Sequence, residues 1–404
     1  MSEIIFGLDV GTTKICALVG EVSNRQLRII GVGMEPARGM RRGVVTDVPE
    51  ATTAIAKAIE QAERTSGYDL SEAVVTISGE HINSTNNRGT VGVGRNDEPI
   101  TREDVERVLA AAQDIQLPRN QQIVHLIPRQ FTVDEQHGIV NPVGMRGFKL
   151  EVEAHIVTAD QPALLNLAQC VGNVGINADE YVLNALAAGE AVLEPNEREM
   201  GVIVADIGGG TTDIALYMQG QVWHTKTLAI GGYHISNDVA IGLRAPFEVA
   251  EQVKIQYGDC RPAQIDPDFT FAVEPFGGEK ISVGRQDLAH VIEARVEEIF
   301  QLILEEIKRS GYGGLLPAGI VLTGGTAQLR GITAVAERVL NVPARVAVPK
   351  KVVGLVDALD SPAYASSVGL LRWAMADHYA YRPRDSKAMW GRRMGGFLKA
   401  LLPG

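Results

Sequence analysis

The strongest constraint on the fold of this chain is a motif that occurs twice, about 197 positions apart. The first copy is the run FGLDVGTTKI at 6–15, and the second is VADIGGGTTDIAL at 204–216. Each copy reads as an apolar strand that ends at an aspartate, a turn that contains glycine and two threonines, and a second apolar strand. A repeat at this separation predicts a duplicated domain whose two copies face one another.

Both turns have the composition of a phosphate-binding loop. Glycine lets backbone N–H groups converge on an anion because no Cβ blocks the approach. Hydroxyl donors and one fixed positive charge come from the side chains of Thr12, Thr13, Lys14, Thr211 and Thr212. Two such hairpins that face each other would clamp a triphosphate from both sides.

The aspartates of the two copies suggest a metal. Asp9 and Asp206 end the first strand of each copy, where they would hold Mg²⁺, through water because this ion keeps several of its waters. A third motif, GIVLTGGTAQLRG at 319–331, is an apolar strand, a glycine pair and a helix, which suits a seat for adenosine. The alternative is that the glycines and aspartates only form hairpin turns. Two matched loops followed by the third motif favour the nucleotide interpretation.

Composition excludes several other classes. Neither Walker-A spacing nor G-x-G-x-x-G after the first strand occurs, which argues against P-loop and dinucleotide folds. The net charge of −11 over 404 residues argues against a nucleic-acid partner. Three cysteines, Cys16, Cys170 and Cys260, lie far apart, as in proteins of a reducing compartment. We expect neither a secretory signal nor a membrane-spanning segment.

Hydrophobic periodicity places several elements between the motifs. Helices are predicted over 49–66, from Thr101, over 286–310 and over about 363–376, and a buried strand over 73–78. Thr101 begins its helix with a capping pattern. The stretch from about 80 to 158 is predicted to be a small α+β insertion in the first half.

The C-terminal segment has the pattern of an amphipathic helix after a polar linker. Residues 380–404 carry a net charge of +5, which leaves −16 on the body. Large apolar residues and basic residues lie on different faces of this helix; together they are Trp390, Arg392, Arg393, Met394, Phe397, Leu398, Lys399, Leu401 and Leu402. This pattern predicts a helix that lies in the interface of an anionic membrane. The alternative is a helix docked on the protein itself or on a partner protein.

The motifs together resemble those of the actin, Hsp70 and sugar-kinase superfamily, and more narrowly the FtsA family of bacterial cell-division proteins. The residues that carry the narrower resemblance are the runs GIVNPVG at 138–144, VADIGGGTTD at 204–213, HTK at 224–226, AEQVK at 250–254 and AGIVLTGG at 318–325. The resemblance implies an actin-like, duplicated ribonuclease-H-type α/β fold with two lobes around a nucleotide cleft. It also implies that the insertion is the family's 1C (SHS2-type) subdomain.

The resemblance implies a division of the chain into parts. They are 1–79 (subdomain 1A), 80–160 (1C), 161–226 (remainder of 1A and start of 2A), 227–303 (2B), 304–354 (remainder of 2A), 355–378 (return to 1A), 379–388 (linker) and 389–404 (membrane-targeting helix).

The resemblance also implies site residues for ATP and Mg²⁺. Gly11 to Lys14 would form the first phosphate loop, and Gly208, Gly209, Gly210, Thr211 and Thr212 the second. The nucleoside would be surrounded by Gly232, Glu251, Lys254, Gly324, Gly325 and Gln328. Members of the family polymerise, tether FtsZ filaments to the cytoplasmic side of the cell membrane at the division site and recruit later division proteins through subdomain 1C. The C-terminal peptide of FtsZ would dock on 2B, at Arg295 and Glu298.

One position departs from relatives that hydrolyse ATP well, because Asn184 stands where they tend to carry Glu or Gln. An amide can orient water but cannot deprotonate it, so we expect firm ATP binding and slow turnover. Two alternatives remain open from the sequence: a PilM-type pilus or secretion platform ATPase, which shares the 1C insertion, and a sugar-kinase-like phosphotransferase.

Overall fold

A computed structural model describes residues 3–24, 26–93, 98–314, 316–350, 352–355 and 359–376. The chain divides into two compact units. The first contains residues 3–85, 117–125 and 157–375, apart from residues 25, 315, 351 and 356–358, which the structure does not describe. The second contains 86–116 and 126–156, with the gap at 94–97, and therefore lies within the predicted insertion.

The first sheet of the first unit follows from the first copy of the motif. Strands β1, β2 and β3 form an antiparallel meander, β6 and β11 continue the sheet in parallel beside β1, and β19 joins the far edge at β3. Their bounds are β1 (Glu3–Val10), β2 (Lys14–Ser23), β3 (Gln26–Pro36), β6 (Glu72–Ile77), β11 (Asn177–Leu183) and β19 (Val353–Gly354).

The second sheet repeats this topology from the second copy of the motif. Strands β12, β13 and β14 form the same antiparallel meander, and β17 and β18 extend it in parallel beside β12. The bounds are β12 (Val202–Ile207), β13 (Thr212–Met218), β14 (Gln221–Leu228), β17 (Ile320–Thr323) and β18 (Ala344–Val346). The five strands of the second sheet therefore have counterparts in the first, as the predicted duplication requires, and among the described strands of the first sheet only β19 has none.

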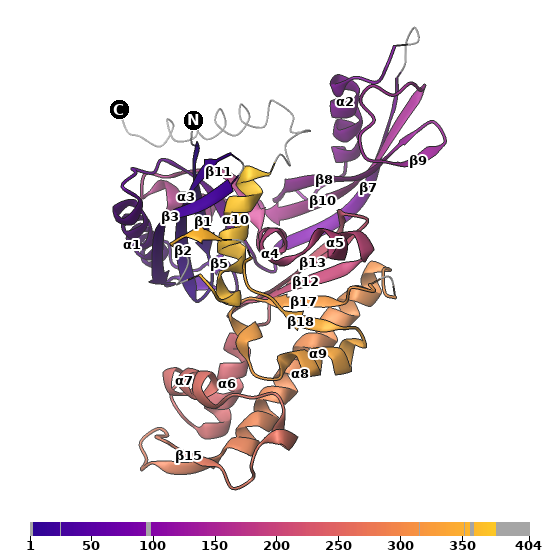
Figure 1. The fold of residues 1–404 in the computed structure, drawn as a ribbon. Coiled ribbons are helices and arrows are strands. Elements are labelled where there is room, and N and C mark those ends of the chain that lie inside the picture. The colour runs from indigo at the N-terminus through magenta and orange to yellow at the C-terminus, as the bar shows by residue number, and fades with distance from the viewer. Residues whose placement is uncertain are drawn as a thin grey trace. The chain divides into compact units, whose positions relative to one another are not determined.

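Helices α1 (Val48–Ser66), α3 (Gln161–Gly172) and α10 (Ala365–Met375) pack on the first sheet, near the short strands β4 (Met40–Arg41) and β5 (Val44–Val45). Helix α4 (Asn184–Val192) packs on α10 and contacts strands of both sheets, and α5 (Pro195–Met200) packs on β13 of the second sheet. The apolar positions of α1 are buried as predicted. Figure 1 shows α10 beside α4 and β1, although it comes from the far end of the chain. The two helices touch backbone to backbone: a methyl group built on Gly369 would lie 1.7 Å from the carbonyl oxygen of Ala187.

The second lobe has a larger helical part and its own core. Its elements are α6 (Gly232–Leu243), α7 (Phe247–Tyr257), β15 (Thr270–Val273), β16 (Ile281–Gly284), α8 (Arg285–Ser310) and α9 (Ile332–Leu340), with short 3₁₀ turns at Pro262–Gln264, Gly325–Gln328 and Pro362–Tyr364. The predicted apolar stripe of α8 is buried, from Leu288 to Ile307. It packs in one cluster with residues of the second sheet and of α6, α7 and α9.

The second unit is the predicted α+β insertion. Its sheet has the order β7-β10-β8-β9, formed by β7 (Ile82–Gly92), β8 (Gln121–Val133), β9 (Gln136–Ile139) and β10 (Lys149–Asp160), and its helix is α2 (Arg102–Gln113). Thr101 and Asp104 form the predicted capping box. Val105, Val108 and Leu109 of α2 pack on Phe131 and Leu150 of the sheet, so this unit has its own core.

Candidate functional site

The two glycine turns have the same hydrogen-bonded geometry. The Gly11 N–H donates to the carbonyl oxygen of Lys14 at 3.0 Å, and the Gly208 N–H donates to that of Thr211 at 2.9 Å. In the strand register, Asp9 lies opposite Cys16 and Asp206 lies opposite Asp213. Both aspartates therefore occupy the same place in the two hairpins.

The two turns face each other at contact distance. A methyl group built on Gly209 would lie 2.2 Å from Cγ2 of Thr13, and one on Gly210 would lie 2.6 Å from Oγ1 of Thr12. Glycine is required at both positions because the opposite loop leaves no room for a Cβ. Thr12 is itself held, since its Oγ1 accepts the N–H of Gly43 at 2.9 Å.

Asp9 is buried and accepts hydrogen bonds from three hydroxyl groups. Its Oδ1 accepts from Thr76 at 2.9 Å, and its Oδ2 accepts from Ser366 at 3.0 Å and from Ser367 at 2.5 Å. Thr76 comes from β6 and the two serines from α10. None of these three was singled out from the sequence, because a hydroxyl in an apolar strand or helix is a weak signal.

Asp206 is buried where several negative charges gather. Burial, with the charges of Asp213 and Asp9, raises the pKa of its carboxyl group to about 8, against the opposing effects of Lys14 and Ser366. Gly324, in the left-handed region at φ +84°, comes so close that a methyl group on it would lie 2.3 Å from Oδ1 of Asp206. A divalent cation beside this carboxylate would offset the charges that disfavour its ionised form. The residues present therefore fit the Mg²⁺ expected there.

Asp213 is a third buried carboxylate, which was not predicted as a site residue although it stands in the second motif. It accepts from Thr227 at 2.6 Å, from Ser78 at 2.7 Å and from Thr211 at 3.1 Å. Burial raises its pKa to about 6, although these hydroxyl donors oppose the shift. Its signal in the sequence was the second aspartate of DIGGGTTD, seven positions after Asp206.

The residues expected around the nucleoside lie next to the second loop. The carbonyl oxygen of Gly208 accepts the N–H of Gly232 at 2.9 Å, at the start of α6, and the hydroxyl of Thr326 at 2.9 Å. Lys254 of α7 is buried, and its Nζ donates to Glu251 at 2.7 Å and to Ser236 at 2.9 Å.

Gly324 directly follows β17, and Gly325 begins the 3₁₀ turn. Gln328 closes this turn, because its Nε2 donates to the carbonyl oxygen of Gly325 at 3.2 Å. The structure therefore brings the third motif to the carboxyl ends of β12 and β17, where open α/β sheets bind their ligands.

Lys14 begins β2, at the end of the first loop. Nζ of Lys14 donates to the carbonyl oxygen of Ala363 and lies 3.8 Å from the ring centroid of Tyr364, contacts that the sequence did not predict. Asn184 begins α4 directly after β11. Its Oδ1 is buried and has no hydrogen-bond partner among the described residues.

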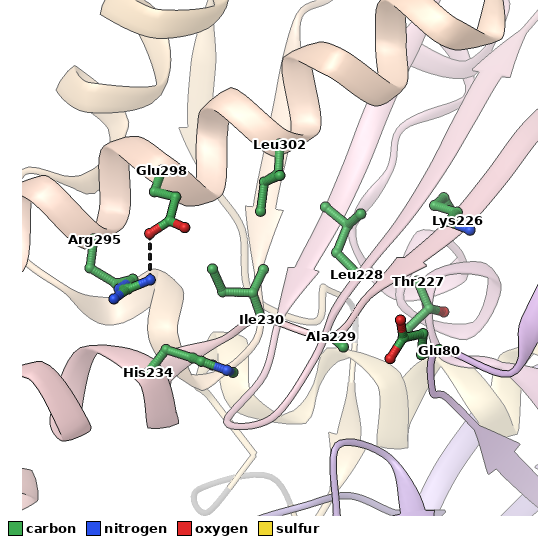
Figure 2. Close-up of a pocket in the computed structure, with 10 residues that line it drawn as sticks. All are labelled: Glu80, Lys226, Thr227, Leu228, Ala229, Ile230, His234, Arg295, Glu298 and Leu302. Atoms are coloured by element: carbon green, nitrogen blue, oxygen red, sulfur yellow. Dashed lines mark hydrogen bonds and ion pairs between the residues drawn. The ribbon is translucent and has the colours of Figure 1, made fainter.

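A cavity of about 380 Å³ lies farther along β14 and α8. Figure 2 shows Arg295 and Glu298 at one end and Lys226, Thr227 and Glu80 at the other. Its middle is lined by apolar side chains of Leu228, Ile230 and Leu302. The guanidinium group of Arg295 is held by Asp238, at 2.5 and 3.0 Å, and by Glu298.

The residues predicted to bind a membrane, Trp390 to Leu402, lie outside the described residues. Within the described part of the chain, no helix combines the length and the apolar character that crossing a membrane requires.

Comparison with known proteins decides the family. The sequence-family model of cell division protein FtsA matches residues 203–369 of this chain. The family model of the SHS2 domain inserted in FtsA matches residues 79–158. The FtsA proteins of Pseudomonas aeruginosa and Bacillus subtilis are each 40% identical, over 92% of this chain and 89% and 84% of theirs. That of Escherichia coli K12 is 35% identical over 98% of both chains.

This chain belongs to the FtsA family. Its family gives it a role in cell division. Solved structures show the actin-like fold of this FtsA-family chain at low identity. A chain of the PilM-PilN type IV pilus biogenesis complex superposes with a TM-score of 0.67 at 16% identity, over 92% of this chain and 98% of that one. MreB5 of Spiroplasma citri bound to ADP gives 0.56 at 14%, over 98% and 99%. The predicted fold class, with its SHS2 insertion, is confirmed.

Proposed function

We propose that this FtsA-family protein binds ATP·Mg²⁺ between its two lobes, polymerises on the cytoplasmic face of the cell membrane, anchors FtsZ filaments at the division site and recruits later division proteins. The observation that carries the proposal is the contact between the two loops, where Thr12 and Thr13 lie against Gly210 and Gly209. In this proposal the two loops together supply backbone N–H groups from both lobes to one anion.

Different residues of the cleft would bind different parts of ATP·Mg²⁺. The loops at 11–14 and 208–212 would hold the phosphates, and Asp9 and Asp206 would hold Mg²⁺ through water. The ion would neutralise phosphate charge. The residues Gly232, Glu251, Lys254, Gly324, Gly325 and Gln328 would surround the nucleoside. Gly232 and Gly324 support this role, since both stand where a Cβ would collide with a neighbour.

Asn184 supports slow hydrolysis. Its amide oxygen is buried and has no hydrogen bond from the described residues, so it would accept one from a water molecule enclosed with the nucleotide. An amide accepts such a bond without removing the proton, so water would be oriented and left neutral. We propose an ATP switch with slow turnover at most.

The cavity of Figure 2 supports the docking of the FtsZ C-terminal peptide in the 2B part, 227–303. An apolar side chain of the peptide would enter between Leu228 and Leu302, and a carboxylate would pair with Lys226 or Arg295. The other subdomains would have the bounds that the family resemblance implies. Among them, 80–160 would be the 1C subdomain that recruits later division proteins. The helix at 389–404 would attach the polymer to an anionic membrane.

One experiment tests nucleotide, polymer and anchor together. The protein is applied to a monolayer of anionic lipid and examined by electron microscopy with ATP·Mg²⁺ and without nucleotide. We expect filaments that depend on ATP and on anionic lipid. Filaments that form equally well without ATP would refute the role of the cleft, and an empty monolayer with filaments in solution would refute the anchor.

A further inference from the structure

Asp213 stands directly between the second phosphate loop and the cavity of Figure 2. Its carboxylate accepts the hydroxyl of Thr211, which belongs to the loop, at 3.1 Å. It also accepts the hydroxyl of Thr227, which lines the cavity, at 2.6 Å. One buried carboxylate therefore touches both the proposed nucleotide site and the wall of a separate cavity.

The first lobe reaches the same carboxylate through Ser78. Its Oγ lies 2.7 Å from Oδ2 of Asp213 and 2.9 Å from Oγ1 of Thr211. Glu80, which lines the cavity beside Thr227, follows Ser78 after a single glycine, Gly79. Gly79 is in the left-handed region at φ +137°, and it is the one residue that separates Ser78 from Glu80.

The hydrogen bonds around Asp213 cannot change independently. Ser78, Thr211 and Thr227 each carry a single hydroxyl proton, and the proton of Ser78 goes either to Asp213 or to Thr211. All four side chains are buried, and a buried polar group that loses its partner is destabilised. A movement of Thr227, which would change its hydrogen bond to Asp213, would therefore disturb the hydrogen bonds that Asp213 shares with Thr211 on the phosphate side.

We propose that Asp213 is a positioning residue that couples the cavity to the nucleotide, so that a peptide bound beside Thr227 and Glu80 and a nucleotide bound at Thr211 change each other's affinity. This inference rests on the proposed function for the identity of both ligands. Thermodynamic linkage requires that the two effects be equal: the factor by which ATP changes peptide affinity is the factor by which the peptide changes ATP affinity.

The coupling is measured on the full-length protein with a labelled peptide of the C-terminus of FtsZ from the same organism. Fluorescence anisotropy gives the peptide Kd without nucleotide, with ATP·Mg²⁺ and with ADP·Mg²⁺, and calorimetry gives the ATP Kd with and without saturating peptide. We expect the peptide Kd to differ at least about fivefold between nucleotide states, with the same factor in the reverse measurement. Peptide Kd values that agree within twofold in all nucleotide states would overturn the coupling while leaving both binding sites in place. Absence of ATP or peptide binding would refute the proposed function, and the coupling with it.

Variants distinguish the path through Asp213 from a general loss of structure. Thr227→Val removes the hydroxyl on the cavity side, and we expect it to bring the coupling factor to near one while ATP alone still binds. Thr227→Ser keeps the hydroxyl and should restore the factor. Thr158→Val is the matched control, because Thr158 is also buried and donates to a side chain, Gln121, away from Asp213. Unchanged coupling in Thr227→Val, or an equal loss in Thr158→Val, would overturn the assignment to Asp213.

Discussion

Gly209 of the second lobe lies against Thr13 of the first lobe so closely that a methyl group on Gly209 would come within 2.2 Å of Cγ2 of Thr13. The two residues belong to corresponding turns of the two duplicated halves. Their contact fixes the spacing between the loops that we propose to hold the phosphates.

Gly209→Ala should therefore push the loops apart. Overpacking of this kind disturbs structure by about 1–3 kcal/mol, so we expect a loss of ATP affinity of about 5- to 150-fold. Calorimetry with ATP·Mg²⁺ measures it. Gly242→Ala in α6 is the control, because a methyl group there meets nothing within 4 Å. ATP affinity in Gly209→Ala equal to that of the control would contradict the role of this contact.

The raised pKa of Asp206 predicts how stability depends on pH. Between about pH 4 and pH 8 the folded chain keeps a proton on Asp206 that the unfolded chain has lost. The free energy of unfolding of the nucleotide-free protein should therefore fall as the pH rises through this window. Asp213, with its pKa near 6, adds a fall of the same sign at lower pH.

Chemical unfolding of wild type and Asp206→Asn at pH 6 and pH 8 measures the effect. We expect the decrease between these pH values to be reduced in Asp206→Asn, since its amide does not titrate. Asp69→Asn, at an exposed position, should behave as wild type. Equal pH dependence in wild type and Asp206→Asn would argue against the shifted group.

The same carboxyl group predicts the pH dependence of nucleotide binding. Mg²⁺ favours the ionised form of Asp206, so ATP·Mg²⁺ binding below pH 8 should release a proton. We expect affinity to rise from pH 6 to pH 8. Calorimetry in buffers of different ionisation enthalpy counts the released protons, and Asp206→Asn should release fewer than wild type.

Asn184 limits hydrolysis in our proposal, so Asn184→Glu should raise the single-turnover rate. A positioned general base contributes roughly 10²- to 10⁴-fold, and we expect at least a tenfold gain from an unoptimised carboxylate. Asn184→Gln is the control, because glutamine has the length of glutamate but ends in an amide. Its single-turnover rate should rise little. Equal rates in both variants would place the limit elsewhere.

The predicted tail helix is tested by co-sedimentation with anionic liposomes. Trp390→Glu places a charge on the apolar face, so binding should be lost, whereas Trp390→Phe should keep most of it. Removal of 389–404 should act like Trp390→Glu. Binding that survives both changes would show that another part of the protein holds the lipid.

Periodicity and motif spacing predicted much of this fold, and contacts between distant segments account for what they missed. The helix at Val48–Ser66 and the long helix at Arg285–Ser310 follow their apolar stripes closely. The duplicated hairpins were predictable because each carries its own aspartate and glycines. Thr76, Ser366 and Ser367 were not predictable as partners of Asp9, since a hydroxyl gains this meaning only from a carboxylate brought to it by the fold.

The lysine of the first loop illustrates the same limit. Its charge and position predicted a phosphate ligand, but not its contacts with Ala363 and Tyr364, which come from a segment about 350 residues away. Asp213 is the opposite case, because its place in DIGGGTTD was visible and only its hydrogen bonds to Ser78 and Thr227 were not.

The bonds from Ser366 and Ser367 to Asp9 have a consequence for biosynthesis. They join residues 357 and 358 positions apart, and a ribosome that adds 5–20 residues per second needs roughly 20–70 s to make the intervening chain. During that interval the first hairpin exists without Ser366 and Ser367, so the carboxylate of Asp9 lacks two of its hydrogen-bond donors. The segment at 389–404 emerges only after those serines, so a nascent chain acquires its proposed lipid anchor after it has acquired the means to complete its cleft.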